Sequence, residues 1–482
     1  MQRPDILIFL SDQHNANIAG FAGDSIVRTP NLDRIAANGT VFDAAYTACP
    51  LCVPARISML TGYLPSRTGC FCNNYSLPDN CADFLHALSL RGYETVLCGR
   101  MHFMGLNQRH GFGSRIMGDF LPSLWGHMDR FNREIGAYAG TIAASHCLDL
   151  IGGGDSPVLA YDRDVCNAAV DYIGRRHGHD RPLCLVVGTY GPHFPYAAPL
   201  DLYRYYLDMV EMPRSLDPEK FSMHPLYECK RKSVDVSVVR RARAAYYGMI
   251  EYIDGLAGNV YDQWKRYLKD SGREGLFVYF SDHGDQVGER MLFGKQTFYE
   301  GSVRIPLIFE GIGISEGKRV DSPVSIMDLG PTLCDIAEAK YPPNRDGISI
   351  RDWLTGTGKP GRYVMSEFAD RGSGGRITPG RMIRKGRWKF ISYAFYEKDD
   401  ILYDIQSDPD EQRNVIGEHP EMAEELRRKC KENWDVDSII GVCKRLDENV
   451  EFLSEYFRDM DEPAGARQPV HAEACLPPVA DL

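Results

Sequence analysis

A cysteine and an arginine four residues apart form the pair of side chains in this sequence that is best suited to chemistry. They begin and end the string Cys52-Val-Pro-Ala-Arg56, which continues as Ile57-Ser-Met-Leu-Thr-Gly62. If the string starts a helix, Cys52 and Arg56 lie one turn apart on the same face. A helix N-terminus favours an anion, or a nucleophile that loses its proton. The spacing therefore predicts a reactive cysteine with a cation beside it.

Three other interpretations of this cysteine are open from the local string. Cys49 and Cys52 form a C-x-x-C pair, the spacing of a thioredoxin-like redox motif or of half a zinc site. Cys70 and Cys72 could supply the other half of such a site. Cysteine is also a common small apolar residue of protein cores. The rest of the chain has to decide between them.

The string from Cys52 to Gly62 resembles the C-x-P-x-R…L-T-G motif of the sulfatases. Ala55 stands where the motif commonly has serine, a small residue for another small residue. The resemblance implies that a maturation enzyme oxidises Cys52 to formylglycine, whose hydrated aldehyde attacks sulfur. Cys52 would then be the precursor of a cofactor made from the chain itself, and Arg56 would help to neutralise the sulfate.

Two strand-like segments end in similar polar strings. The segment Ile6–Leu10 runs into Ser-Asp-Gln-His, and the segment Leu276–Phe280 runs into Ser-Asp-His-Gly-Asp. Ligands of α/β proteins collect at the carboxyl ends of the strands. Carboxylate and amide oxygens suit Ca²⁺ or Mg²⁺, whereas an imidazole favours Mn²⁺ or another transition ion. Each aspartate alone could instead cap a turn.

Both strings match the metal positions of the sulfatases. The resemblance implies one divalent cation, with Ca²⁺ as the first choice and Mn²⁺ or Mg²⁺ as alternatives. Its expected ligands are Asp12, Gln13, Asp282, His283 and the formylglycine made from Cys52.

Three further segments resemble sulfatase motifs and occur in the family's order. Cys98–Gly105 resembles G-K-W-H-x-G, which implies that His102 orients the hydrated aldehyde and that Arg100 stands in place of a lysine. The Pro-His-Phe-Pro string around His193 resembles the P-H-x-P loop, which implies a proton donor to the leaving oxygen. The Gly-Lys…Tyr-Glu-Gly segment resembles another motif, in which Lys295 would contact sulfate.

The sequence also departs from the common sulfatase pattern. Many sulfatases have Asp-Asp where this chain has Asp12-Gln13, and Asp-Asn where it has Asp282-His283. These variants resemble the branch of choline sulfatase and phosphonate monoester hydrolase. Hydrolysis of a phosphonate monoester or phosphodiester is therefore an alternative function. A binding protein whose Cys52 is never matured is a second alternative, from outside the enzymes.

Composition limits the class of protein. The formal net charge of −11 argues against general nucleic-acid binding, and no stretch is apolar enough to span a membrane. The start of the chain has too short an apolar run for a secretory signal. Fourteen cysteines without framework spacing indicate thiols in a reducing compartment, so we expect a cytoplasmic protein. Its expected partners are a small-molecule or carbohydrate sulfate ester and the maturation enzyme.

The elements that must position these residues alternate between strands and helices. Apolar runs without alternation predict strands buried on both faces. They are Ile6–Leu10, Thr95–Cys98, Leu183–Val187, Leu276–Phe280 and Pro306–Phe309. Helices are expected at 32–37, 240–268 and 327–336. The pattern predicts an α/β fold with a large, mostly parallel sheet flanked by helices, and the family resemblance implies an alkaline-phosphatase-like version of it.

The chain is expected to divide into three parts. Residues 1–341 would form the catalytic α/β domain, and 342–434 a smaller antiparallel subdomain with strands at 363–367, 381–383 and 388–392 and a helix at 420–434. Residues 435–482 would be a tail that wraps the body or meets another subunit in a homo-oligomer. Loops around the pocket would select the alcohol. The side chains that we expect there are Tyr75, Trp125, Tyr196, Arg371 and Arg376.

Overall fold

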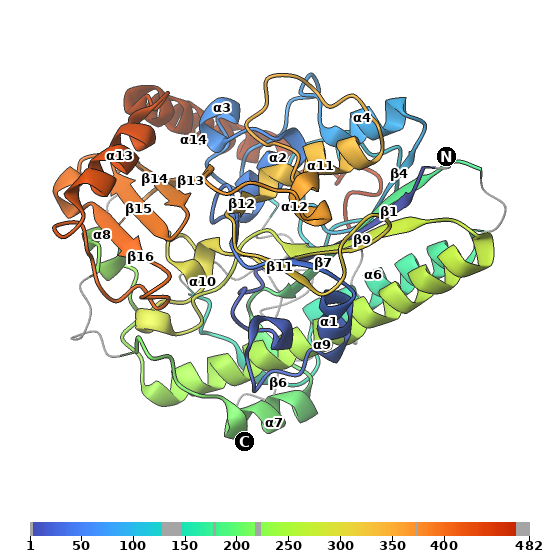
Figure 1. Cartoon of the computed structure of the whole chain (residues 1–482), viewed down its shortest axis with the longest axis horizontal. Helices are drawn as coiled ribbons and strands as arrows, with labels where there is room; N and C mark the ends of the chain where they lie inside the picture. Colours follow the sequence, from blue (N-terminus) through green and yellow to red (C-terminus); the bar gives the residue numbers. More distant parts are fainter. Residues whose placement is uncertain (1–2, 128–145, 177–179, 217–222, 373–374, 469–482) are drawn as a thin grey trace.

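A computed structural model of the chain describes residues 3–127, 146–176, 180–216, 223–372 and 375–468. Its centre is a sheet of eight strands (Figure 1). From one edge to the other, the strands are β11 (Lys318–Val320), β2 (Gly39–Phe42), β10 (Leu307–Gly311), β9 (Gly275–Ser281), β1 (Asp5–Asp12), β7 (Leu183–Pro192), β4 (Glu94–Gly99) and β5 (Ser114–Met117). β10 runs antiparallel to both of its neighbours and the other pairs are parallel, which confirms the predicted mostly parallel sheet.

Both faces of the sheet are covered by helices, as the continuous apolar runs require. In β1, Ile6, Ile8 and Leu10 join one apolar cluster, and Leu7 and Phe9 join the other. The first cluster lies under α2 (Cys52–Thr61), α4 (Phe84–Leu90) and α11 (Leu329–Ile336). The second lies under α1 (Pro30–Ala37), α6 (Pro157–Gly174) and α9 (Val236–Ser271), on the lower side of the sheet in Figure 1. The alternation places each apolar side chain of β1 in one of the two cores.

Shorter elements connect and extend these layers. The strands are β3 (Ala45–Tyr46), β6 (Ile151–Gly153), β8 (Tyr196–Ala198) and β12 (Val324–Ser325). The helices are α3 (Pro65–Thr68), α7 (Leu200–Met209), α8 (Pro225–Glu228), α10 (Glu300–Val303) and α12 (Arg351–Thr355). Among the described helices, none is both long and apolar enough to cross a membrane.

The C-terminal part contains a second, smaller sheet, as predicted. Its four antiparallel strands follow one another in chain order, and α13 (Pro420–Lys431) packs on them. The strands are β13 (Tyr363–Asp370), β14 (Thr378–Lys385), β15 (Trp388–Tyr393) and β16 (Ile401–Asp404). The buried ammonium of Lys389 on β15 bonds Glu300 at 2.8 Å and Glu411 at 2.7 Å. This contact ties the smaller sheet to the body, and the division at 341 and 434 stays a prediction.

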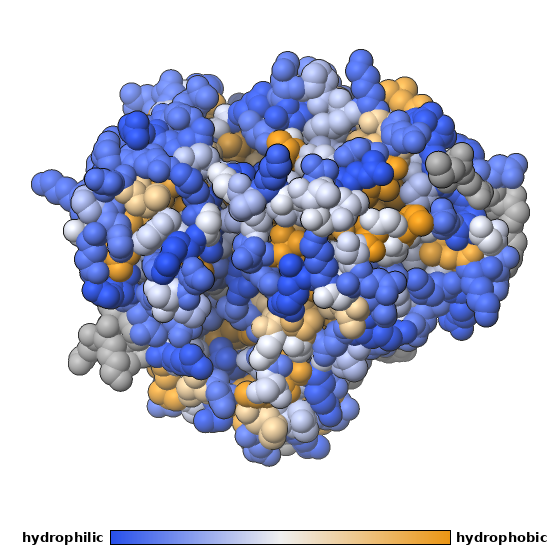
Figure 2. All heavy atoms as spheres, viewed as in Figure 1, coloured by the Kyte–Doolittle hydropathy of each residue, from blue (hydrophilic) through white to orange (hydrophobic). Residues whose placement is uncertain are grey.

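The described part of the tail wraps the body. It begins with α14 (Val436–Phe457), a helix that the sequence analysis did not anticipate. Beyond it, the chain returns to the loop that follows β5, where Asp119 and Arg467 form a β-bridge. The predicted contact with another subunit falls partly on residues 469–482, outside the described residues. On the face shown in Figure 2, hydrophilic side chains predominate and hydrophobic ones form small separate patches.

Candidate active site

The two polar strand ends meet because β1 and β9 are parallel neighbours. Ser11 pairs with Ser281 in the register, so Asp12 and Asp282 leave the sheet side by side. Ligand atoms of Asp12, Cys52, Asp282 and His283 all lie within 4.8 Å of one another, and all four residues are buried. Within the described parts of the chain, this is the one group of three or more such side chains with metal-site spacing.

The donor set of this cluster fits a divalent cation. Oδ1 of Asp12 and Oδ1 of Asp282 lie 3.8 and 3.7 Å from Nε2 of His283, so three ligand atoms converge. Nδ1 of His283 is 3.1 Å from the carbonyl oxygen of Gly284, which accepts the Nδ1 proton. The other ring nitrogen, Nε2, then carries the lone pair that can bind a metal ion. Burial lowers the pKa of His283 to about 4, which keeps the imidazole neutral as a ligand must be.

Arg56 bonds the carboxylates of Asp12 and Asp282 and holds them in place. Its Nη2 donates to Oδ2 of Asp12 at 3.0 Å and its Nε to Oδ2 of Asp282 at 2.9 Å. One guanidinium thus bonds Oδ2 of each carboxylate, and each Oδ1 faces the cluster, where Oδ1 of Asp282 also accepts two backbone N–H groups. Burial alone would raise the pKa of Asp12, but the charges of Arg100, His193 and Arg56 outweigh it and hold that pKa well below its usual range.

Cys52 is the first residue of α2. Leu51 is extended before it, and Gly62 ends the helix in the left-handed conformation with φ of +71°. The Cys52 Sγ lies 3.2 Å from Nε2 of His283 and 3.0 Å from Nζ of Lys295. A helix N-terminus, an imidazole and an ammonium therefore surround this one side chain, which is the electropositive setting of a functional cysteine.

The other cysteines considered for a redox pair or a zinc site do not form such a cluster. Thirteen cysteines of the described chain are free, including Cys49, Cys70 and Cys72. Burial raises the pKa of Cys49 well above its usual value, which makes it an inert thiol. The described residues therefore do not support a zinc site at Cys70 and Cys72, nor a formed disulfide at the C-x-x-C pair.

Gln13 lies beside the cluster with its side chain engaged by other groups. Its amide oxygen accepts from Lys295 Nζ at 2.7 Å, and its Nε2 donates to Asp285 at 2.6 Å. Its backbone has φ of +70°, a strained conformation of the kind found at functional sites. Asp285, which the sequence analysis did not single out, also accepts from Tyr196 at 2.9 Å. Gln13 as a metal ligand stays a prediction.

Arg100 and His102 form a second bonded group at the cavity wall. Arg100 Nε donates to Asp12 at 2.7 Å and its Nη2 to Nδ1 of His102 at 2.8 Å. Because arginine only donates, His102 accepts at Nδ1 and carries its proton at Nε2. Burial and the neighbouring Arg100 lower the pKa of His102 well below its usual value, which keeps this neutral form.

Asp119 supports that pair and was missed by sequence reasoning. It accepts from Arg100 Nη1 at 3.0 Å and from the backbone N–H of His102 at 2.8 Å. Asp119 stands alone in a loop without a recognisable spacing, so no local pattern could have marked it. Asp285, in contrast, follows Asp282 in the string Asp-His-Gly-Asp and could have been included from that repeat of acidic residues.

His193 follows β7 at its carboxyl end. Buried Asp162 accepts the backbone N–H groups of Tyr190 at 2.6 Å and Gly191 at 2.7 Å, which fixes the loop. Nδ1 of His193 is 2.6 Å from the Phe194 carbonyl, so Nε2 is the atom that can exchange a proton with a ligand. Burial and then the charge of Lys295 lower the pKa of His193.

These side chains open into a cavity of about 450 Å³. The residues that line it include Cys52, Arg100, His102, His193 and Lys295. Trp125 also lines it, as expected for a substrate loop, and Arg371 lines an adjoining cavity. Tyr196 instead is a buried partner of Asp285. Tyr75 and Arg376 are not among the described residues that line either cavity.

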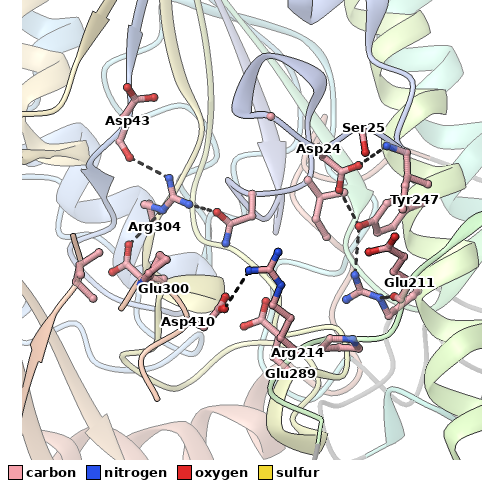
Figure 3. A pocket seen from close by; sticks show the side chains of 18 of the residues that line it. Asp24, Ser25, Asp43, Glu211, Arg214, Tyr247, Glu289, Glu300, Arg304 and Asp410 are labelled. Carbon is pink, nitrogen blue, oxygen red and sulfur yellow. Dashed lines mark hydrogen bonds and ion pairs between the residues drawn. The ribbon is translucent and has the colours of Figure 1, made fainter. Parts of the chain in front are cut away.

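A separate cavity of about 470 Å³ shares no lining residue with the first. Figure 3 shows that its charged side chains face one another. Arg304 bonds the Asp43 carbonyl at 2.9 Å and Glu300 at 3.2 Å, and Arg214 lies 3.7 Å from Asp410. Tyr247 donates to Asp24 at 2.8 Å. These pairings are internal, so we place the reaction in the cavity at Cys52.

Comparison with known proteins shows the family of this chain. The family described as Sulfatase matches residues 4–339, and the family described as N-sulphoglucosamine sulphohydrolase, C-terminal, matches residues 288–435. The choline-sulfatase of Rhizobium meliloti is 32% identical over 450 residues, which cover 87% of this chain and 83% of the relative. An arylsulfatase of Clostridium perfringens is 27% identical, with 88% and 93% covered.

Solved structures show the same fold. A 2-O GAG sulfatase has a TM-score of 0.70 at 23% identity, with 98% of this chain and all of that chain covered. The phosphonate monoester hydrolase of Agrobacterium radiobacter has a TM-score of 0.71 at 21% identity, with 92% and 96% covered. The family match spans more than half of the sequence and includes every residue of the site described above. The chain belongs to the sulfatase family and is a sulfuric ester hydrolase.

Proposed function

We propose that this enzyme hydrolyses a sulfate monoester through a formylglycine made from Cys52, with one divalent cation. The observation that carries the proposal is the position of Cys52, at a helix start and within 4.8 Å of ligand atoms from Asp12, Asp282 and His283. The formylglycine would be made by a maturation enzyme and, once hydrated, supplies the nucleophilic hydroxyl.

A divalent cation would be held by Asp12, Asp282, His283 and the side chain of residue 52, with Gln13 as a further candidate. It would supply positive charge next to the sulfate oxygens. Two carboxylates favour Ca²⁺ as the first choice, and the imidazole keeps Mn²⁺ and Mg²⁺ as alternatives. Arg56 would act by fixing the two carboxylates, since its Nε and Nη2 donate to them and its Nη1 donates to the Arg100 carbonyl.

The chain's other cations bind and orient the anion. Lys295 and Arg100 line the cavity at Cys52 and can neutralise a sulfate oxygen there. His102 presents its Nε2 proton as a donor, because Arg100 engages Nδ1. His193 can pass a proton from Nε2 to the oxygen of the departing alcohol. Asp119 holds Arg100 and His102 in position.

The substrate class can be tested with matched anions. Aryl sulfate, aryl phosphonate and aryl phosphodiester with the same phenol should be compared by kcat/KM, using protein whose residue 52 is confirmed as formylglycine and Cys52→Ala as the blank. We expect the sulfate to be favoured. A preference of more than about tenfold, roughly 1.4 kcal/mol of transition-state free energy, for the phosphonate or the diester would instead support the alternative hydrolase.

We also propose a cytoplasmic location. The free thiols of the described chain, among them the half-buried Cys72 and the exposed Cys229, support a reducing compartment. Fractionation of the native host with an antibody against the chain would test this proposal, and recovery outside the cytoplasm would contradict it.

A further inference from the structure

The buried carboxylate of Asp285 links three segments of the chain at the candidate active site. Its Oδ1 accepts the backbone N–H groups of Val287 and Gly294, each at 2.8 Å. Its Oδ2 accepts from Nε2 of Gln13 at 2.6 Å and from the Tyr196 hydroxyl at 2.9 Å. Asp285 is not among the described residues that line the active-site cavity, so it can influence a bound substrate only through its partners.

The side-chain amide of Gln13 has only one orientation that satisfies both of its partners. An ammonium only donates hydrogen bonds, and an ionised carboxylate only accepts them. The amide atom that lies 2.7 Å from Nζ of Lys295 must therefore be the oxygen, and the atom that lies 2.6 Å from Asp285 must be the nitrogen. Gln13 is itself buried, so a wrongly turned amide would leave polar groups without partners. Asp285 thus determines which end of the amide faces Lys295.

The oxygen of Gln13 in turn holds the ammonium of Lys295 beside the side chain of residue 52. Nζ of Lys295 lies 3.0 Å from Sγ of Cys52, and both residues line the same cavity. Asp285 also fixes the backbone of this segment, because it accepts the N–H of Gly294, the residue before Lys295. One carboxylate outside the cavity therefore positions Lys295 in two ways, through the Gln13 amide and through the adjacent backbone.

We propose that Asp285 is a positioning residue, which turns the amide oxygen of Gln13 toward Lys295 and thereby holds that ammonium where it meets the sulfate. The inference rests on the proposed function, in which Lys295 binds the anion. It goes beyond that function because it assigns a role in the reaction to a carboxylate that touches neither the substrate nor residue 52.

The substitution Asp285→Asn separates the effect on the amide from the effect on the backbone. The asparagine oxygen can still accept the N–H groups of Val287 and Gly294, so the segment before Lys295 keeps its hydrogen bonds. The asparagine nitrogen then faces Nε2 of Gln13, and two donors cannot bond each other. The Gln13 amide has to turn over, which places its nitrogen against the ammonium of Lys295.

A double-mutant cycle at positions 13 and 285 tests the inference, in protein saturated with Ca²⁺ and with residue 52 confirmed as formylglycine. We expect Asp285→Asn to lower kcat/KM for nitrophenyl sulfate, and to raise the inhibition constant of inorganic sulfate, by roughly tenfold or more. Gln13→Glu alone should also be impaired, because it places two carboxylates against each other. In the Asp285→Asn protein, Gln13→Glu returns an acceptor to both neighbours and should regain roughly tenfold in kcat/KM. Wild-type values in either single variant, or a double variant no better than Asp285→Asn, would overturn the inference.

Tyr196→Phe is the matched control, because it removes a different hydrogen bond of the same carboxylate and leaves the Gln13 amide in place. We expect it to change kcat/KM by less than about twofold. An equal loss in Tyr196→Phe and Asp285→Asn would show that Asp285 only supports packing, and would overturn the inference. Thermal unfolding checks that each variant is folded. These outcomes, in an active wild type, overturn the inference alone, whereas a wild type without turnover would overturn the proposed function and this inference with it.

Discussion

Arg56 illustrates how a residue of the motif acts through its neighbours. It is 1% exposed and bonds both Asp12 and Asp282, so it determines how the two carboxylates are oriented. Removal of one partner from a buried ion pair leaves uncompensated charge. A lysine at this position would lack the planar fork that reaches both carboxylates.

We predict that Arg56→Ala lowers the free energy of unfolding by about 3–5 kcal/mol and releases the bound cation. Urea unfolding and elemental analysis of the purified protein measure the two effects. Arg67→Ala is a matched control, because Arg67 pairs with Asp346 at the surface with 41% of its side chain exposed and should cost less than about 1 kcal/mol. A variant of Arg56 that kept its metal and its stability would show that the bridge does not position the carboxylates.

The proposed role of His193 predicts how kcat/KM depends on pH. Its pKa lies below the ordinary value of 6.5 because of burial and Lys295, and only the protonated imidazole can donate to the leaving oxygen. If it is the acid, kcat/KM falls as pH rises through this lowered pKa of the free enzyme. The bound sulfate adds negative charge beside the imidazole, so the corresponding fall of kcat should occur at higher pH.

In His193→Gln this fall should disappear. The loss of rate should be greatest for esters of alcohols with a high pKa, whose oxygen must be protonated as it leaves. It should be smallest for nitrophenyl sulfate, because nitrophenolate leaves readily without a proton. Rate profiles of both proteins with alkyl and nitrophenyl sulfates are the measurement. Parallel profiles for wild type and variant would assign the proton to another group.

At the scale of elements, one carboxylate of the tail bonds the loop that lines the cavity. Glu462 bonds Ser123 and His127, which flank Trp125 in the lining of the cavity. We predict that Glu462→Ala raises KM several-fold for sulfates of a large alcohol and leaves methyl sulfate unaffected, because methyl sulfate is too small to reach Trp125. Glu455→Ala, at an exposed position of α14, is the control. A uniform change of kcat for both substrates would instead indicate a general structural defect.

The strands could be predicted from the sequence where both of their faces are buried. Continuous apolar runs at 6–10, 183–187 and 276–280 could only be central strands, and the structure confirms them as β1, β7 and β9. The short strand β2 next to the edge strand β11 gave no such signal, because Gly39 and Thr40 are not part of an apolar run. The helix α14 was missed because its buried residues are few, namely Ile439, Cys443 and Phe457, within an otherwise polar stretch.

The site was predictable to the extent that its residues lie in recognisable strings. Asp12, Cys52, Asp282 and His283 are together, as strand ends and the sulfatase motif indicate. Asp119 could not be found, since its role depends on a loop that packs beside Arg100. The bonds of Gln13 to Lys295 and Asp285 could not be found either, because side-chain pairing across strands is a property of the folded chain.

At the scale of the whole molecule, a bound cation should stabilise the fold. A ligand that binds only the native state adds free energy of unfolding, about 2.7 kcal/mol at a free concentration of 100 times Kd. We predict that EDTA lowers Tm and abolishes turnover together, and that excess Ca²⁺ restores both. EDTA saturated with Ca²⁺ should have no effect. Unchanged Tm and rate in protein shown by elemental analysis to be free of metal would contradict the metal site.

The chemical state of residue 52 is the most direct test of the proposed nucleophile. The measurement is mass spectrometry of the peptide that contains residue 52, from protein co-expressed with a formylglycine-generating enzyme, together with the sulfatase activity of the same sample. We predict that the thiol is replaced by an aldehyde and that activity rises in proportion to the converted fraction. A preparation in which residue 52 is entirely a thiol but sulfate esters are hydrolysed at the full rate would contradict the proposed function.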